Sequence, residues 1–184
     1  RARELLYADI QAMLRTQQRE MPFQFIKFHG IFDDAMNVYK EDGLGNPILN
    51  FYYTDAVLDF LLEINLKPLI QLSFMPKDLA KHPSRTLFFY PFIISEPKDD
   101  SKWTYLVSEF TKHVIKRYGR KEVSSWLFTF WNETFNHFPF DLPDVETSLR
   151  LYDISYKAVK ELLPEVSFTS ISYVAYDFPS ENYD

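Results

Sequence analysis

Trp131, Asn132 and Glu133 place an amide and a carboxyl group at the point where an apolar segment of the chain ends. A carboxyl group beside aromatic side chains is poorly solvated as an anion, and this raises its pKa. A raised pKa suits a general acid that works near neutral pH. The residues alone leave a second interpretation open, because Asn and Glu also begin turns after a strand by bonding backbone amides.

His29, Asp33 and Asp34 form a second polar group, which follows another aromatic-rich segment. A histidine and two carboxylates are ligand types that a metal ion can use. No further ligand of recognisable spacing joins them, so we predict no metal site and interpret the aspartates as a solvated acidic loop. The glycines form no phosphate-binding fingerprint, and we predict no cofactor.

The elements around these residues alternate between helices and strands. The first helix is expected at 2–20, with Leu6, Ile10, Met13 and Leu14 inward. A second is expected at 54–65 with Thr54 as its N-cap, and a third runs from Ser101, its N-cap, to Gly119. A fourth ends before Pro164. Strands are expected at 23–28, 68–74, 125–133 and 166–173, with long loops to about residue 53 and at 75–100. Strands that are apolar on both sides are typical of a parallel sheet with helical crossovers. The polar groups fall at the carboxyl ends of these strands, where sites of such folds lie.

Composition narrows the possible partners. The chain has 20 Lys and Arg against 26 Asp and Glu, so we expect no nucleic-acid contact through this segment. A hydrophobic fraction of 46% excludes disorder, and the absence of Cys excludes thiolate chemistry. No apolar run reaches the roughly 20 residues of a membrane span, and no signal peptide is visible. We therefore predict no membrane contact and a cytoplasmic location; the oligomeric state is not predicted.

Three motifs, taken in order, resemble glycoside hydrolase family 39, the β-xylosidase and α-iduronidase family. They are Phe-His-Gly-Ile-Phe-Asp-Asp at 28–34 with Met36 and Tyr39, Phe-Met-Pro at 74–76, and Trp-Asn-Glu at 131–133. The resemblance implies an α/β fold that is part of a (β/α)8 barrel, about strands 2 to 5 with their helices. Such barrels contain about 250 residues. We therefore expect residues 1–184 to be a partial barrel domain of a longer polypeptide, without a second domain.

The same resemblance implies a retaining glycosidase that acts on short xylosides or related carbohydrates. Glu133 would be the general acid/base, Asn132 would hydrogen-bond the sugar's 2-hydroxyl, and His29 would contribute to the sugar subsite. Retaining hydrolysis needs a second carboxyl group about 5–5.5 Å from the first. The family carries it on the seventh strand, and no Glu here matches it, so we expect the nucleophile outside this chain and an inactive isolated fragment.

The sequence also departs from the family, since Thr134 stands where a proline usually follows the glutamate. Barrels similar to family 39 also occur behind the DNA-binding helices of arabinose-regulator-type transcription factors. The alternative function is therefore a sugar-sensing, non-catalytic barrel domain of a transcriptional regulator.

Overall fold

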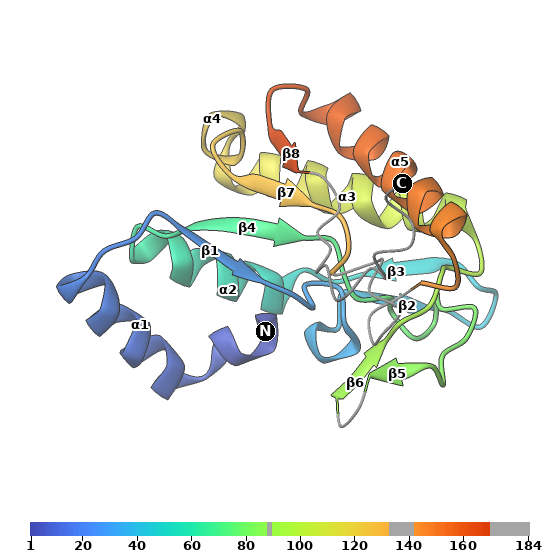
Figure 1. Cartoon of the computed structure of the whole chain (residues 1–184), viewed down its shortest axis with the longest axis horizontal. Helices are drawn as coiled ribbons and strands as arrows, with labels where there is room; N and C mark the ends of the chain where they lie inside the picture. Colours follow the sequence, from blue (N-terminus) through green and yellow to red (C-terminus); the bar gives the residue numbers. More distant parts are fainter. Residues whose placement is uncertain (88–89, 133–141, 170–184) are drawn as a thin grey trace, which may run out of the picture.

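A parallel sheet of four strands forms the centre of the fold (Figure 1). The computed structural model describes residues 1–87, 90–132 and 142–169. The strands are β1 (Phe25–Phe28), β4 (Lys67–Gln71), β7 (Leu127–Thr129) and β8 (Ser167–Thr169), and they lie side by side in that order. Each parallel strand therefore lies next to the parallel strand before it, as in a barrel, whereas a doubly wound sheet reverses direction at a switch point.

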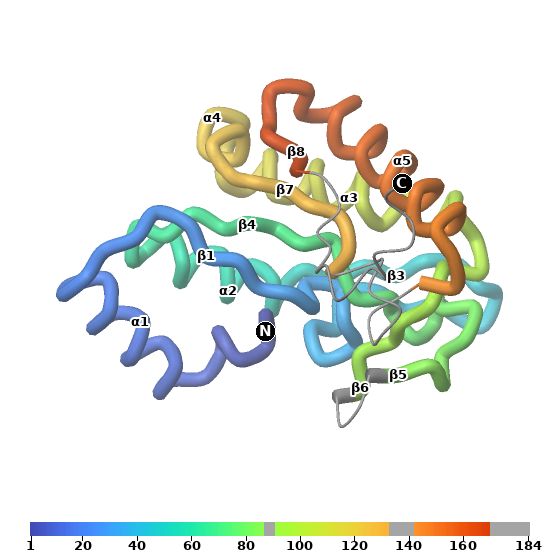
Figure 2. The backbone as a smooth tube through the Cα atoms, viewed as in Figure 1, coloured from blue at the N-terminus to red at the C-terminus, as the bar shows by residue number. Residues whose placement is uncertain are grey.

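Helices connect these strands, as the sequence pattern predicts. The connecting helices are α2 (Tyr52–Glu63), α3 (Asp100–Tyr118) with the short α4 (Arg120–Val123), and α5 (Val145–Leu162). Figure 2 shows α2, α3 and α5 in the same spatial order as the strands that they precede. Trp103 of α3 donates a 2.9 Å hydrogen bond to the buried hydroxyl of Ser155 on α5, which joins two neighbouring helices inside the core.

The prediction of one helix over 2–20 is wrong. Residues Ala2–Leu6 form the 3-10 helix η1, and α1 (Ala8–Glu20) begins only after Tyr7, whose ψ of 132° is extended. Within α1, Leu14 is buried, but Met13, which was predicted to face the core, is 58% exposed.

Two predicted N-caps are also wrong. The helix α2 begins before Thr54, and the side chain of Asn50 accepts from the backbone N–H of Tyr52 instead. Thr54 is instead the third residue of α2, and its side chain is fully buried. The cap of α3 is Asp99, whose carboxylate accepts from the backbone N–H groups of Ser101 and Lys102. In both cases a side chain nearer the amino terminus reaches the unpaired amides first.

The two predicted loops contain short strands. The first holds the 3-10 helix η2 (Asp34–Met36) and an antiparallel hairpin of β2 (Tyr39–Glu41) with β3 (Pro47–Leu49). The second holds a hairpin of β5 (Thr86–Leu87) with β6 (Tyr90–Ile93). Strands this short contain too few residues to show a period of two.

The parallel strands are shorter than predicted at their ends. β4 ends at Gln71 and β7 at Thr129, so the polar motifs lie in the segments that leave the sheet. Of the strand predicted at 166–173, the part from 170 onward lies outside the described residues. Within the described ranges, no helix is both long and apolar enough to cross a bilayer.

Candidate active site

Three of the predicted motifs meet at the carboxyl edge of the sheet. His29 directly follows β1, Phe74 follows β4, and Trp131 follows β7. The ring of Phe74 lies between the other two, 5.9 Å from the His29 ring and 5.4 Å from the Trp131 ring, measured between centroids. Segments that are far apart in the sequence therefore form one aromatic wall behind His29.

Phe92 of β6 completes this wall and was not predicted. Its ring stacks on Phe74 at 4.7 Å and meets the His29 ring edge-on at 6.2 Å. We define the aromatic wall as Phe74, Phe92 and Trp131. Phe74, Phe92 and Trp131 are buried, whereas His29 is half-buried. The wall thus holds the imidazole in place and leaves part of it available to a ligand.

The environment of His29 favours the neutral imidazole. Burial lowers the pKa of His29 to about 4, and the positive charge of Lys27 acts in the same direction. A neutral imidazole has one N–H donor and one acceptor nitrogen. At neutral pH His29 can therefore exchange hydrogen bonds with a hydroxyl group without adding a charge to the site.

Asn132 lies in the segment that leaves β7 and is buried, with 4% of its surface exposed. Its side-chain oxygen Oδ1 accepts a 3.2 Å hydrogen bond from Nε2 of Gln71. The same nitrogen of Gln71 donates a 2.7 Å hydrogen bond to the main-chain oxygen of Trp131. Gln71 was not among the predicted site residues. The available signal was its position, since Gln71 is a polar residue that directly follows the apolar run of residues 68–70.

Glu133, the predicted acid/base, lies outside the described residues. Its role stays a prediction that rests on the sequence and on its position directly after Asn132.

The interpretation of Asp33 and Asp34 as a solvated loop is wrong for Asp33. Asp33 is 4% exposed, its Oδ1 accepts from the backbone N–H of Ala35 at 2.7 Å, and burial raises its pKa to about 6. Asp34 is half-buried and pairs with Lys40 at 3.3 Å and with the backbone N–H of Lys77 at 3.0 Å. The two carboxylates hold loops together, and no cluster of three metal-ligand residues occurs in the described part of the chain.

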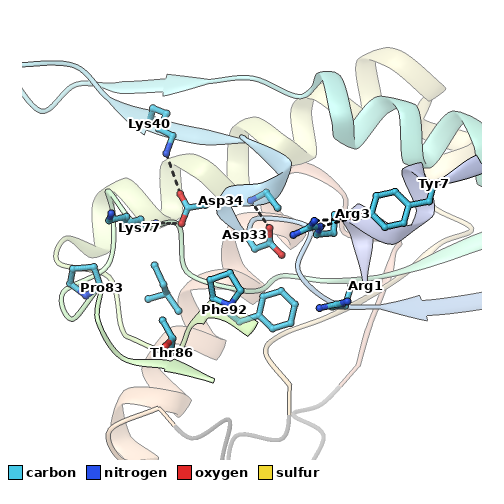
Figure 3. Close-up of a pocket in the computed structure, with 13 residues that line it drawn as sticks. Arg1, Arg3, Tyr7, Asp33, Asp34, Lys40, Lys77, Pro83, Thr86 and Phe92 are labelled. Carbon is cyan, nitrogen blue, oxygen red and sulfur yellow. Dashed lines mark hydrogen bonds and ion pairs between the residues drawn. The ribbon is translucent and has the colours of Figure 1, made fainter. Parts of the chain in front are cut away.

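A cavity of about 550 Å³ adjoins the aromatic wall through Phe92 (Figure 3). Its charged lining residues are Arg1, Arg3, Asp33, Asp34, Lys40 and Lys77. Figure 3 shows Asp33 and Asp34 between Arg3 on one side and Lys40 and Lys77 on the other. The volume lies within the range of about 300–1,000 Å³ that is usual for small-molecule sites.

Comparisons with known proteins place this arrangement in a family. The profile of "Glycosyl hydrolases family 39" matches residues 1–177. A β-xylosidase of Caldicellulosiruptor saccharolyticus is 37% identical over 161 residues, which are 88% of this chain and 33% of that protein. A β-xylosidase of Geobacillus stearothermophilus is 36% identical over 157 residues, 83% of this chain and 31% of that protein.

A solved structure shows the same family similarity in three dimensions. The crystal structure of a monomeric β-xylosidase from Caulobacter crescentus CB15 superposes with a TM-score of 0.83 at 32% identity. The match covers 89% of this chain and 33% of that one, so the chain spans about a third of the length of these relatives. The four-stranded sheet is thus part of a (β/α)8 barrel, and the chain belongs to glycosyl hydrolases family 39.

Proposed function

We propose that these residues form the acid/base side of the active site of a retaining glycoside hydrolase that acts on short β-xylosides. The observation that carries the proposal is that His29 packs on one aromatic wall at the carboxyl edge of the sheet, with Asn132 directly after Trp131 of that wall. The relatives of the chain are named β-xylosidases. That edge is where barrels of this class place their chemistry. Residues 1–184 would then be one part of a single barrel domain.

In this mechanism Glu133 gives its proton to the glycosidic oxygen while a second carboxylate, outside these 184 residues, forms a bond to the anomeric carbon. The leaving group departs as an alcohol. The ionised Glu133 then takes a proton from water, and the water oxygen displaces the second carboxylate from the anomeric carbon. The neutral His29 and the amide of Asn132 hydrogen-bond the sugar and hold it at the reacting carboxyl groups.

The test uses the full-length protein that carries these residues and an aryl β-xyloside as substrate. Glu133→Gln is expected to lower kcat/KM by about 100-fold or more, because the acid that protonates the leaving group is lost. The loss should be smaller for leaving groups that depart without protonation. Glu146→Gln, on the exposed first turn of α5, is the matched control and should leave turnover unchanged. Unaltered turnover in Glu133→Gln would exclude the acid/base role.

The second candidate is a sugar-sensing, non-catalytic barrel of a transcriptional regulator, and the observation in its favour is Thr134 in place of the usual proline. A protein of this kind would bind a xylo-oligosaccharide in a calorimeter without hydrolysing it. Detectable release of xylose during the titration would argue for the enzyme. Both candidates take a carbohydrate ligand, and a cytoplasmic location is proposed with them.

A further inference from the structure

Gln71 connects two strands at the candidate active site. It is the last residue of β4, the strand that lies beside β7 (Figure 1), and it is paired in register with Thr129 at the end of β7. Its side chain reaches the segment that leaves β7 and contacts both Trp131 and Asn132 there. Gln71 is fully buried and Asn132 nearly so. Because buried amides lose much free energy without hydrogen bonds, these contacts define the orientation of both side chains.

The orientation of the Gln71 amide follows from the main chain. The carbonyl oxygen of Trp131 can only accept a hydrogen bond, and it lies 2.7 Å from Nε2 of Gln71. The reversed amide would place two oxygens in contact at this distance. The NH2 group of Gln71 must therefore face Trp131, and its second hydrogen is directed to Oδ1 of Asn132 at 3.2 Å.

The orientation of Asn132 follows in turn. Its oxygen is occupied by Gln71, so the amide end turned away from Gln71 is the NH2 group, which only donates. We propose that Gln71 is a positioning residue that fixes the Asn132 amide with its NH2 group toward the bound sugar, where it donates to the oxygen of a ring hydroxyl. The identity of that hydroxyl, the 2-hydroxyl, rests on the proposed function; the orientation rests on the hydrogen bonds of Gln71.

The kinetic test compares two substrates in the full-length protein, an aryl β-xyloside and its 2-deoxy analogue. Gln71→Met removes both donors but keeps the length of the side chain. We expect kcat/KM for the xyloside to fall about 10- to 100-fold, the loss of one well-placed hydrogen bond. The value for the 2-deoxy analogue should change little, because that substrate lacks the hydroxyl. An equal fall on both substrates would mean that Gln71 only supports the fold, and would overturn the inference.

A double-mutant cycle gives an independent result. If Gln71 acts through Asn132, then Gln71→Met should have no further effect on xyloside turnover in an Asn132→Ala background. Additive losses would contradict the inference. Gln24→Met is the matched control, since Gln24 is exposed just before β1, and it should behave as wild type on both substrates.

A measurement without any substrate separates this inference from the proposed function. If the wild-type protein neither hydrolyses nor binds xylosides, the proposed function fails. The side-chain NH2 hydrogens of Gln71 should still exchange slowly with D2O in the NMR spectrum, because both are bonded inside the core. Exchange as fast as that of Gln24 would overturn the positioning role, whatever the catalytic result.

Discussion

The carboxylate of Asp33 lies directly against the backbone of Gly30: a Cβ atom added at Gly30 would stand 2.7 Å from Oδ2 of Asp33. Gly30 has a φ of +82° and follows His29. The turn after β1 therefore depends on a residue without a side chain. The contact also keeps the Asp33 carboxylate buried beside the candidate active site.

Gly30→Ala is expected to destabilise the fold by about 1–3 kcal/mol, because it adds both a steric clash and an unfavourable positive φ. Urea denaturation measures the change. Gly43→Ala is the control, since nothing lies within 4 Å of its added Cβ, and its φ is not positive. Equal effects of the two substitutions would show that the contact with Asp33 is unimportant.

Asp33 should make stability depend on pH. Burial raises its pKa from 3.8 to about 6, so the folded state binds the proton more tightly than the unfolded state. The stability due to protonated Asp33 is fully present below pH 3.8 and is lost as the pH rises through about 6. Relative to Asp33→Asn, the wild type should lose about 3 kcal/mol over this range. Urea denaturation of both proteins between pH 4 and pH 7 gives the difference, and a difference that is constant with pH would contradict the prediction.

Lys102 connects α3 to the β2–β3 hairpin. Its ammonium group lies 2.9 Å from Oε1 of Glu41 and donates to the main-chain oxygen of Gly45 at 2.6 Å. Lys102→Met should lower stability by about 1–3 kcal/mol, because it leaves a largely buried carboxylate with one cation fewer. Thermal unfolding measures the loss. Lys112→Met, on the exposed face of the same helix, should leave the unfolding midpoint unchanged.

Ser155 provides the partner of a buried indole. Ser155→Ala leaves the N–H of Trp103 without its 2.9 Å acceptor, and the expected loss is about 1–3 kcal/mol. Ser148→Ala on the same helix is the control, because the hydroxyl of that buried residue donates to the main-chain oxygen of Asp144 and not to α3. A similar loss in both variants would indicate that the contact between α3 and α5 contributes little.

Local sequence patterns predicted the order of helices and strands, because the spacing of apolar residues within each segment indicates whether it forms a helix or a strand. In α5, for example, Leu151, Ala158 and Val159 recur at helical spacing and are buried. Apolar strands that end in polar residues likewise located His29 and Asn132. The caps were misassigned where two capable residues lie close together, as Asp99 and Ser101 do before α3.

Contacts between distant segments were not predictable in the same way. Phe92 belongs to a hairpin too short to show a period, and its stacking on Phe74 depends on the folded loop. Gln71 meets Asn132 only because β4 and β7 are adjacent in the sheet, a relationship that no local pattern contains. The assignment of Glu133 depends on the sequence alone.

The matching order of the parallel strands in sequence and in space also bears on synthesis of the protein. A ribosome releases β1 with His29 first, β4 with Gln71 next, and β7 with Asn132 after that. Translation adds about 5–20 residues each second, which is slow compared with the docking of a single strand and helix. Gln71 is therefore released before Asn132, and the hydrogen bond between the two amides can form only after the segment that follows β7 has been synthesised.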